Sequence, residues 1–189
     1  MEKKLDLRVQ KTYKALLGAL YSLLCEKSFD QITVTELCDR AETRKATFYK
    51  HFGDKTELFS YMIKEMQQRA QEEQKVQYDP AHPQQFYVDV FRYFLDFLDK
   101  NEVFVRKILS SSARASLIDL LSVQIEHDLK LHFKDDLSAG VDFHGDPDLL
   151  AALYTGAMIY CAEWWITQPN RMDKEQVVSQ FSELLARIF

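Results

Sequence analysis

The sequence predicts an all-α fold of about nine helices with no confident strand. Apolar residues recur every three or four positions along most of the chain, which is the spacing of one helix face. Glycine and proline, which interrupt helices, number only five and four among 189 residues. Capping boxes mark several helix starts. A single unit of this length would bury roughly 70% of its unfolded surface, so it needs no cross-links.

The first predicted helix covers about residues 7–27, where the apolar positions fall on one face. The second helix begins at Thr33, which forms a capping box with Glu36 and so satisfies free backbone N–H groups. A break over residues 42–44 separates this short helix from a third one over 45–52. Two helices joined by a tight turn are therefore expected in this part of the chain.

The fourth helix is predicted to begin after Asp54, which forms a second capping box with Glu57. Two prolines within residues 78–83 oppose its continuation. The same apolar spacing predicts five further helices at about residues 86–98, 104–109, 117–133, 147–168 and 173–188.

A loop is expected over residues 136–146, and its last residue supplies an N-cap for the next helix. That helix, 147–168, is nearly apolar for 14 residues before Glu163, which is too short for a membrane span and predicts a buried helix. Ala152 and Gly156 lie four residues apart in it, which allows a close approach by another helix.

The charge of the chain is unevenly distributed. Residues 1–55 hold 11 Lys and Arg against 8 Asp and Glu, a balance of +3, and the remaining residues hold 13 against 21, a balance of -8. An acidic body with a mildly basic N-terminal end indicates a local anionic partner.

Cysteine usage and the N-terminus indicate a reducing compartment. Cys25, Cys38 and Cys161 are odd in number and far apart, without the spacing of a zinc site or a disulfide framework. The first residues lack the apolar core of a signal peptide. We therefore expect a cytoplasmic protein with free thiols and no metal site.

The basic residues of the N-terminal end gather in R-K-A-T-F-Y-K-H-F-G-D-K, residues 44–55. On a helix over 45–52, Phe48 and Phe52 share one face and can join the core. A short helix presented by a preceding helix through a tight turn is the arrangement that enters the major groove of DNA. Charge and spacing alone leave two interpretations open: a DNA-reading helix, or a solvated basic face beside two core aromatic residues.

The side chains of this stretch suit contact with DNA. Lysine and arginine can bind guanine edges or phosphates, and Thr47 can meet a base or a thymine methyl group. Tyr49 and His51 can donate to phosphate oxygens. Lys55 lies in the first turn of the next helix, where a cation is disfavoured, and an external phosphate would remove that conflict.

The stretch T-F-Y-K-H-F-G-D-K, preceded by T-V-T-E-L-C-D-R-A, resembles the tetracycline-repressor (TetR) family of bacterial regulators over about residues 8–63. The residues that carry the resemblance are Thr47, Phe48, Tyr49, His51, Phe52 and Lys55. The turn departs from the family pattern, because Glu42 stands where glycine is common and brings a negative charge near DNA. Ser28 also replaces a common glycine before the second helix.

The resemblance implies an N-terminal helix-turn-helix DNA-binding domain, residues 1–54, joined by the fourth helix to a helical ligand-binding and dimerisation domain, residues 55–189. It also implies roles for individual residues. The expected base contacts are Lys45, Thr47 and Lys50. The expected phosphate contacts are Tyr49, His51 and Lys55, with Thr33 or Thr35 at the start of the second helix, and Arg44 could do either.

The resemblance further implies a homodimer on a near-palindromic double-stranded operator, and repression released by an unknown small-molecule effector. In the homodimer the last two helices would form a four-helix bundle, although the small residues of 147–168 could equally serve a contact within the chain. A regulator whose C-terminal half senses a protein partner is the alternative. The aromatic residues of 86–104 fit either a core or a pocket for an apolar ligand.

The sequence gives no support for an enzyme. It contains no nucleophile motif and no phosphate-binding glycine loop. His127 and His132 are five residues apart, whereas four would align them on one helix face. We therefore predict no catalytic residue, no cofactor and no association with a membrane.

Overall fold

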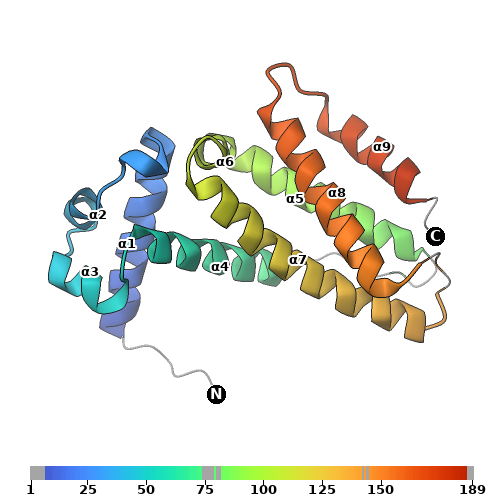
Figure 1. The fold of residues 1–189 in the computed structure, drawn as a ribbon, viewed down its shortest axis with the longest axis horizontal. Helices are drawn as coiled ribbons and strands as arrows, with labels where there is room; N and C mark the ends of the chain where they lie inside the picture. Colours follow the sequence, from blue (N-terminus) through green and yellow to red (C-terminus); the bar gives the residue numbers. More distant parts are fainter. Residues whose placement is uncertain (1–6, 74–78, 80–81, 142, 144, 187–189) are drawn as a thin grey trace. The chain divides into compact units, whose positions relative to one another are not determined.

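The structure is a computed structural model that describes residues 7–73, 79, 82–141, 143 and 145–186. These residues form nine α-helices, one 3-10 helix and no strand, which confirms the predicted fold class (Figure 1). The elements are α1 (Leu7–Glu26), η1 (Phe29–Gln31), α2 (Val34–Arg40), α3 (Lys45–His51), α4 (Lys55–Glu73), α5 (Pro83–Lys100), α6 (Glu102–Leu109), α7 (Ala113–Ser138), α8 (Pro147–Thr167) and α9 (Lys174–Leu185).

The predicted caps form at the helix starts. The Thr33 hydroxyl oxygen accepts from Glu36 N at 3.2 Å at the start of α2. At the start of α4, Asp54 Oδ1 accepts from Glu57 N at 2.9 Å, and Gly53 N donates to the Glu57 carboxylate at 2.6 Å. Each cap satisfies backbone N–H groups that have no partner within the helix, which fixes where the helix begins.

The chain divides into two compact units. The first comprises Met1–Ala70 and Val103–Leu117, and the second comprises Gln71–Glu102 and Ile118–Phe189. In the first unit, α1 packs against α2 and α2 packs against α3. Its core consists of apolar side chains that are at most 4% exposed, among them Leu16, Leu20, Leu24, Leu37, Phe48, Phe52, Leu58 and Phe59.

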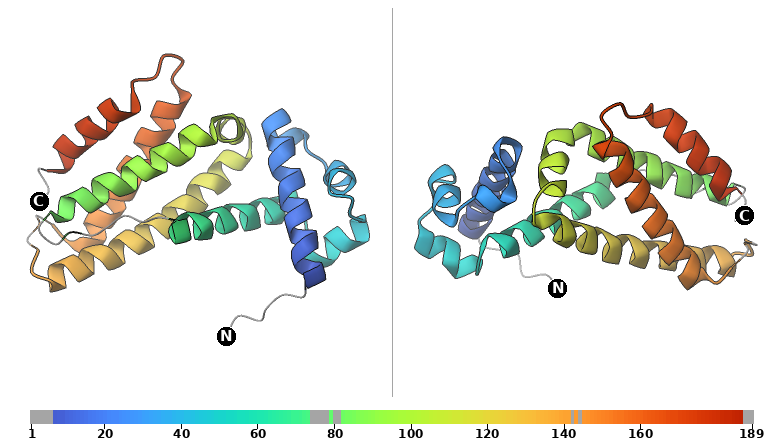
Figure 2. Two further views of the ribbon diagram at one scale, coloured as in Figure 1. Left: turned by 180° about the vertical axis from the view of Figure 1, so that it is seen from behind. Right: turned by 45° about the horizontal axis from the view of Figure 1, so that its top comes forward.

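In the second unit, α5 packs against both α8 and α9. Figure 2 shows α9 lying beside α5 from two further directions. Tyr87 and Phe91 of α5 are fully buried, and the ring of Phe91 lies 4.1 Å from that of Phe181 in α9. The aromatic residues of α5 therefore supply core packing in this unit.

The loop expected over residues 136–146 begins later than predicted, because α7 continues to Ser138. Asp136 is only 2% exposed and accepts a hydrogen bond from the Tyr87 hydroxyl at 2.7 Å. This buried contact holds the last turn of α7 against α5. Sequence periodicity missed it because an aspartate in a polar stretch resembles a loop residue.

Helix α8 has two different faces. One face is buried and includes Tyr154, Met158 and Trp165. By length and composition α8 could cross a membrane, but its most apolar window is 44% buried within the protein. One such helix is weak evidence for a membrane span, because the core helix of a soluble protein passes the same test, and the buried face of α8 packs on α5.

Candidate nucleic-acid interface

The turn between α2 and α3 brings two short helices into contact, as a helix-turn-helix requires. Ala41 N donates to Leu37 O at 2.9 Å, and Thr43 N donates to Cys38 O at 2.8 Å. Between them Glu42 has φ 49°, a left-handed conformation that favours glycine. The turn keeps the geometry of a glycine-containing turn although glutamate occupies this position.

Helix α3 buries one face and exposes the opposite one. Phe48 is completely buried, whereas Tyr49 is 57% exposed and Lys50 lies beside it on the surface. Arg44, the N-cap residue, and Lys45 are also exposed. The side chains that could reach a base edge or a phosphate therefore lie on the open face, and the aromatic anchor lies inside.

His51 and Thr47 are half-buried at the edge of that face. The ring of Tyr13 in α1 packs edge-on against His51 at 5.3 Å and lies 5.0 Å from the ring of Phe52. Tyr13 also meets Tyr61 of α4 at 5.1 Å. These contacts fix the C-terminal end of α3 against α1 and α4, so His51 is held rather than free to rotate.

Thr33 and Thr35 are both exposed at the start of α2. The Thr33 oxygen accepts the capping hydrogen bond, and its hydroxyl hydrogen can still donate to an external acceptor. The start of α2 is thus compatible with the phosphate contact expected from the sequence.

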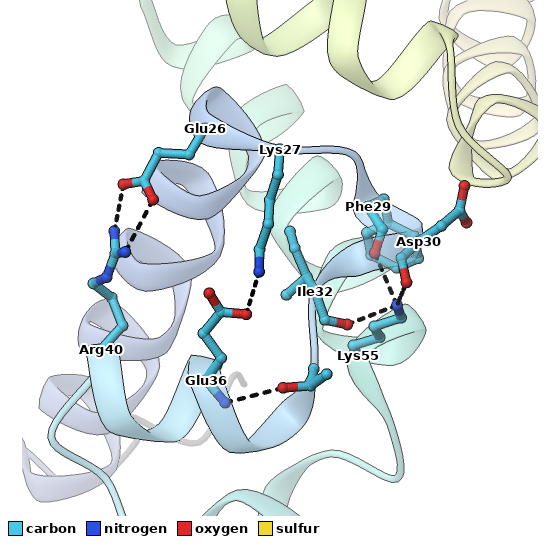
Figure 3. A network of polar contacts seen from close by, with 9 residues as sticks. Glu26, Lys27, Phe29, Asp30, Ile32, Glu36, Arg40 and Lys55 are labelled. Carbon is cyan, nitrogen blue, oxygen red and sulfur yellow. Dashed lines mark hydrogen bonds and ion pairs between the residues drawn. The ribbon is translucent and has the colours of Figure 1, made fainter.

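Two ion pairs join the end of α1 and the residue after it to α2, and sequence patterns did not predict either (Figure 3). Arg40 donates to both carboxylate oxygens of Glu26, at 2.6 and 3.0 Å, and to the Ser22 hydroxyl at 2.9 Å. Lys27 donates to Glu36 at 2.5 Å. The hydrogen bonds from Arg40 hold the pKa of the Glu26 carboxyl below its usual range.

Lys55 has partners other than those expected from the sequence (Figure 3). Its ammonium donates to three backbone carbonyls, those of Phe29 at 2.8 Å, Asp30 at 3.3 Å and Ile32 at 2.8 Å. The ammonium also lies 4.6 Å from the centre of the Phe29 ring. Burial lowers the pKa of Lys55. The three carbonyl oxygens offset the unfavourable position of this cation at the start of α4, and the phosphate contact of Lys55 stays a prediction.

Comparison with known proteins matches the chain to bacterial transcriptional regulators. A profile described as "Bacterial regulatory proteins, tetR family" matches residues 16–62, and one described as "Transcriptional regulator C-terminal region" matches residues 81–187. Two uncharacterized HTH-type transcriptional regulators of Bacillus subtilis (strain 168) share local identity. YdeS is 48% identical over 48 residues, 25% of this chain and 24% of YdeS. YxbF is 40% identical over 63 residues, 33% of this chain and 17% of YxbF.

The chain therefore aligns with a quarter or less of either relative, whereas several solved structures match it over nearly their whole length. Salmonella enterica GusR has a TM-score of 0.73 at 17% identity, covering 98% of this chain and 99% of GusR. FadR of Bacillus subtilis, solved in complex with stearoyl-CoA, has a TM-score of 0.70 at 18% identity, covering 94% and 100%. The dihydroxyacetone kinase operon activator DhaS has a TM-score of 0.67 at 22% identity, covering 94% and 96%.

These structural likenesses establish the fold, and the two profile matches establish the family. The matched profiles indicate a DNA-binding regulator, and the open basic face of α3 and the turn before it agree with this. The chain belongs to the TetR family of transcriptional regulators.

Proposed function

We propose that the protein is a dimeric, sequence-specific repressor that a small-molecule effector releases from its operator. The single observation that carries the DNA-binding part is the two-sided character of α3. Its aromatic anchor is buried, and its basic and hydroxyl-bearing side chains are directed outward. A helix of this kind can enter the major groove while the rest of the first unit supports it.

On this proposal, the exposed and half-buried polar residues of α3 divide between contacts to bases and contacts to the DNA backbone. Lys45, Thr47 and Lys50 reach base edges, while Tyr49 and His51 hold phosphates. Thr33 or Thr35 adds a phosphate contact at the start of α2, and Arg44 binds either. Lys55 is left out of this set, because its three N–H groups already meet carbonyl oxygens.

The dimer is proposed to form through α8 and α9. The outward face of α8 carries apolar or small residues at helical spacing, namely Leu149, Ala152, Leu153, Gly156, Ala157, Tyr160 and Trp164. Four of them are large and 45–72% exposed. A Cβ atom added at Gly156 would meet nothing within 4 Å, so the chain itself does not occupy the space beside it. A second copy of α8 suits this open apolar face.

The effector is proposed to bind within the second unit. The Thr155 hydroxyl oxygen is buried in α8 and has no hydrogen-bond partner among the described residues. Buried polar groups normally have a partner, and a polar group of an effector would supply one. FadR of Bacillus subtilis, which shares the fold, was solved with stearoyl-CoA, and this supports an effector with a long apolar part here.

The test of the proposal is DNA binding by the purified chain. The protein should retard DNA that flanks its own gene in a gel-shift assay, and selection from random or genomic fragments should recover a near-palindromic site. Two-fold symmetry predicts half-sites about 34–36 Å apart, centre to centre. A reporter driven by that site should fall in activity when the protein is present, and a rise would show activation. Failure to recover any site by either route would contradict the proposal.

A further inference from the structure

We propose that Lys55 is a positioning residue for DNA binding, acting through the η1 turn rather than on a phosphate, and that Ser112 supports the same turn from its other side. The inference rests on the proposed function, because what the turn positions is the DNA-binding surface of α3. It concerns three places that are far apart in the sequence and meet in the first unit: residues 29–32, Lys55 and Ser112.

The Lys55 ammonium is fully occupied by the turn. An ammonium has three N–H donors, and the three carbonyls of Phe29, Asp30 and Ile32 lie within hydrogen-bonding distance of Nζ. The Phe29 ring, itself only 4% exposed, covers the ammonium from one side. A phosphate would have to displace these partners, so the geometry favours a role inside the protein.

The hydrogen bond from Lys55 to Ile32 closes a loop that contains both helices of the helix-turn-helix. Ile32 directly precedes Thr33, the N-cap of α2. Lys55 is the first residue of α4, and only three residues separate it from the end of α3. The 2.8 Å contact therefore joins the chain just before α2 to the chain just after α3. It limits how far the two helices can shift against α4, which is what an accurate fit to base edges requires.

Ser112 binds the same turn through the carboxylate of Asp30. Asp30 accepts from Ser112 N at 3.2 Å and also from the Ser112 hydroxyl. Ser112 lies directly before α7, 82 residues away in the sequence. Lys55 therefore binds backbone carbonyls of the η1 turn, and Ser112 binds the carboxylate of Asp30 in the same turn. Loss of either contact should loosen the same element.

The experiment compares the salt dependence of operator affinity in matched variants. A phosphate contact contributes about 0.9 to the slope of log K against log salt, whereas a positioning contact contributes nothing to it. Lys55→Met keeps the apolar stem and removes the ammonium. Lys64→Met is the control, because Lys64 is exposed on the same helix. Operator affinity is measured by fluorescence anisotropy between 50 and 200 mM salt, at a temperature where circular dichroism shows every variant folded.

We expect Lys55→Met to weaken operator binding about tenfold with an unchanged slope, since three acceptors lose a charged donor. Lys55→Gln retains N–H donors without the charge and should recover part of the affinity at that same slope. Ser112→Ala should weaken binding about threefold, consistent with one lost hydrogen bond. Ser110→Ala is its control, because the Ser110 hydroxyl donates to carbonyls of α6, Arg106 O and Lys107 O. Both controls should stay within about twofold of wild type.

Two results would overturn the inference. A slope that falls by about 0.9 in Lys55→Met and Lys55→Gln would make Lys55 a phosphate contact. If Lys55→Met and Ser112→Ala lower the melting temperature but bind the operator with wild-type affinity, the contacts of the turn contribute to stability and not to DNA binding. If Lys55→Met does not fold, Lys55→Gln and Ser112→Ala decide between these outcomes. Wild-type protein that binds no DNA contradicts the proposed function and removes this inference with it, so the two failures are distinguishable.

Discussion

Helices α3 and α8 each bury one face and expose the other, yet their exposed faces differ in chemistry. The open face of α3 carries Lys45, Tyr49 and Lys50. The open face of α8 carries Leu153 and Tyr160, which are 58% and 72% exposed. Among the residues that the structure describes, no element of the same unit covers either face, so both are suited to an external partner.

The difference between the two faces indicates different partners. Cationic and hydroxyl-bearing side chains gain from contact with a polyanion, whose bound counterions they release. Apolar side chains beside small residues gain from burial against another apolar helix. The proposed function follows from this contrast, and four changes test it, in order from the largest expected effect to the smallest.

The largest effect is expected for Gly156→Leu on α8. A Cβ atom at this position meets no other atom within 4 Å, so the monomer should fold, but the leucine side chain blocks the close approach of a second α8. We expect the dimer dissociation constant to rise at least about hundredfold, by the cost of overpacking an interface. Analytical ultracentrifugation over a concentration series measures it.

Gly18→Leu provides the control for that substitution. Gly18 is also an exposed helical glycine, in α1, and a Cβ there likewise meets nothing within 4 Å. The two variants share the same change in helix propensity and differ only in the face they alter. A Gly156→Leu protein that stays dimeric at nanomolar concentration, like Gly18→Leu, would contradict the proposed interface.

The next effect is expected for Lys50→Ala on α3. Loss of a base contact should cost about 1–3 kcal/mol on the best site and relax the preference at one position of each half-site. Selection from a random DNA library, followed by sequencing, reads out that preference. Lys64→Ala on α4 should leave the recovered motif unchanged. If both variants recover the wild-type motif, Lys50 does not read bases.

The contrast between the two faces was only partly predictable from the sequence. Local patterns predicted Thr33 as a cap and Phe48 as a core residue, because both depend on neighbours within four positions. The exposed stripe of α8 was not evident, since α8 is apolar all round and periodicity cannot separate its two faces. Only the packing against α5 shows which side remains open.

The contacts of Lys55 and Asp30 were beyond the reach of sequence patterns for a different reason. Lys55 bonds to carbonyls 23 to 26 residues away, and backbone carbonyls carry no side-chain signature. Asp30 and Ser112 are 82 residues apart. Such contacts depend on which distant segments of the chain come together in the fold, and a single sequence does not reveal this. The sequence therefore predicted a phosphate contact for Lys55 and did not predict its carbonyl partners.

A smaller effect is expected for Glu42→Gly in the turn before α3. Glycine adopts the φ of 49° without the steric cost that a side chain carries, so the free energy of unfolding should rise by about 1 kcal/mol. Urea denaturation measures the change. Glu42→Gln retains the side chain and removes the charge, so it should leave stability nearly unchanged.

The same two variants test the charge of the turn. Both remove one negative charge near the proposed DNA surface, so both should bind DNA more tightly and to a similar extent. Equal stability of Glu42→Gly and Glu42→Gln would show that the left-handed conformation costs the protein little. A gain in affinity for glycine alone would show that flexibility, not charge, limits binding.

The smallest effect concerns pH and the η1 turn, which precedes α2. The hydrogen bonds from Ser112 hold the pKa of the Asp30 carboxyl below its usual range. A lowered pKa in the folded state contributes stability above the unfolded pKa of about 3.9, and this contribution is lost as the pH falls through the folded value. Wild-type protein should therefore lose stability below about pH 4 more steeply than Asp30→Asn, which cannot titrate.

Urea midpoints measured between pH 6 and pH 3 test this difference, and Asp39→Asn, an exposed aspartate of α2, serves as the control. The effect should be small, because Asp30 is exposed and solvent screens its interactions. Ser112→Ala should partly flatten the pH dependence of the urea midpoint. It removes the hydroxyl donor to the Asp30 carboxylate, while the backbone N–H donor remains. If Asp30→Asn and Asp39→Asn change the acid slope equally, the Ser112 contact does not hold the turn in solution. The contrast between the α3 and α8 faces would then hold without a role for the η1 turn in positioning α3.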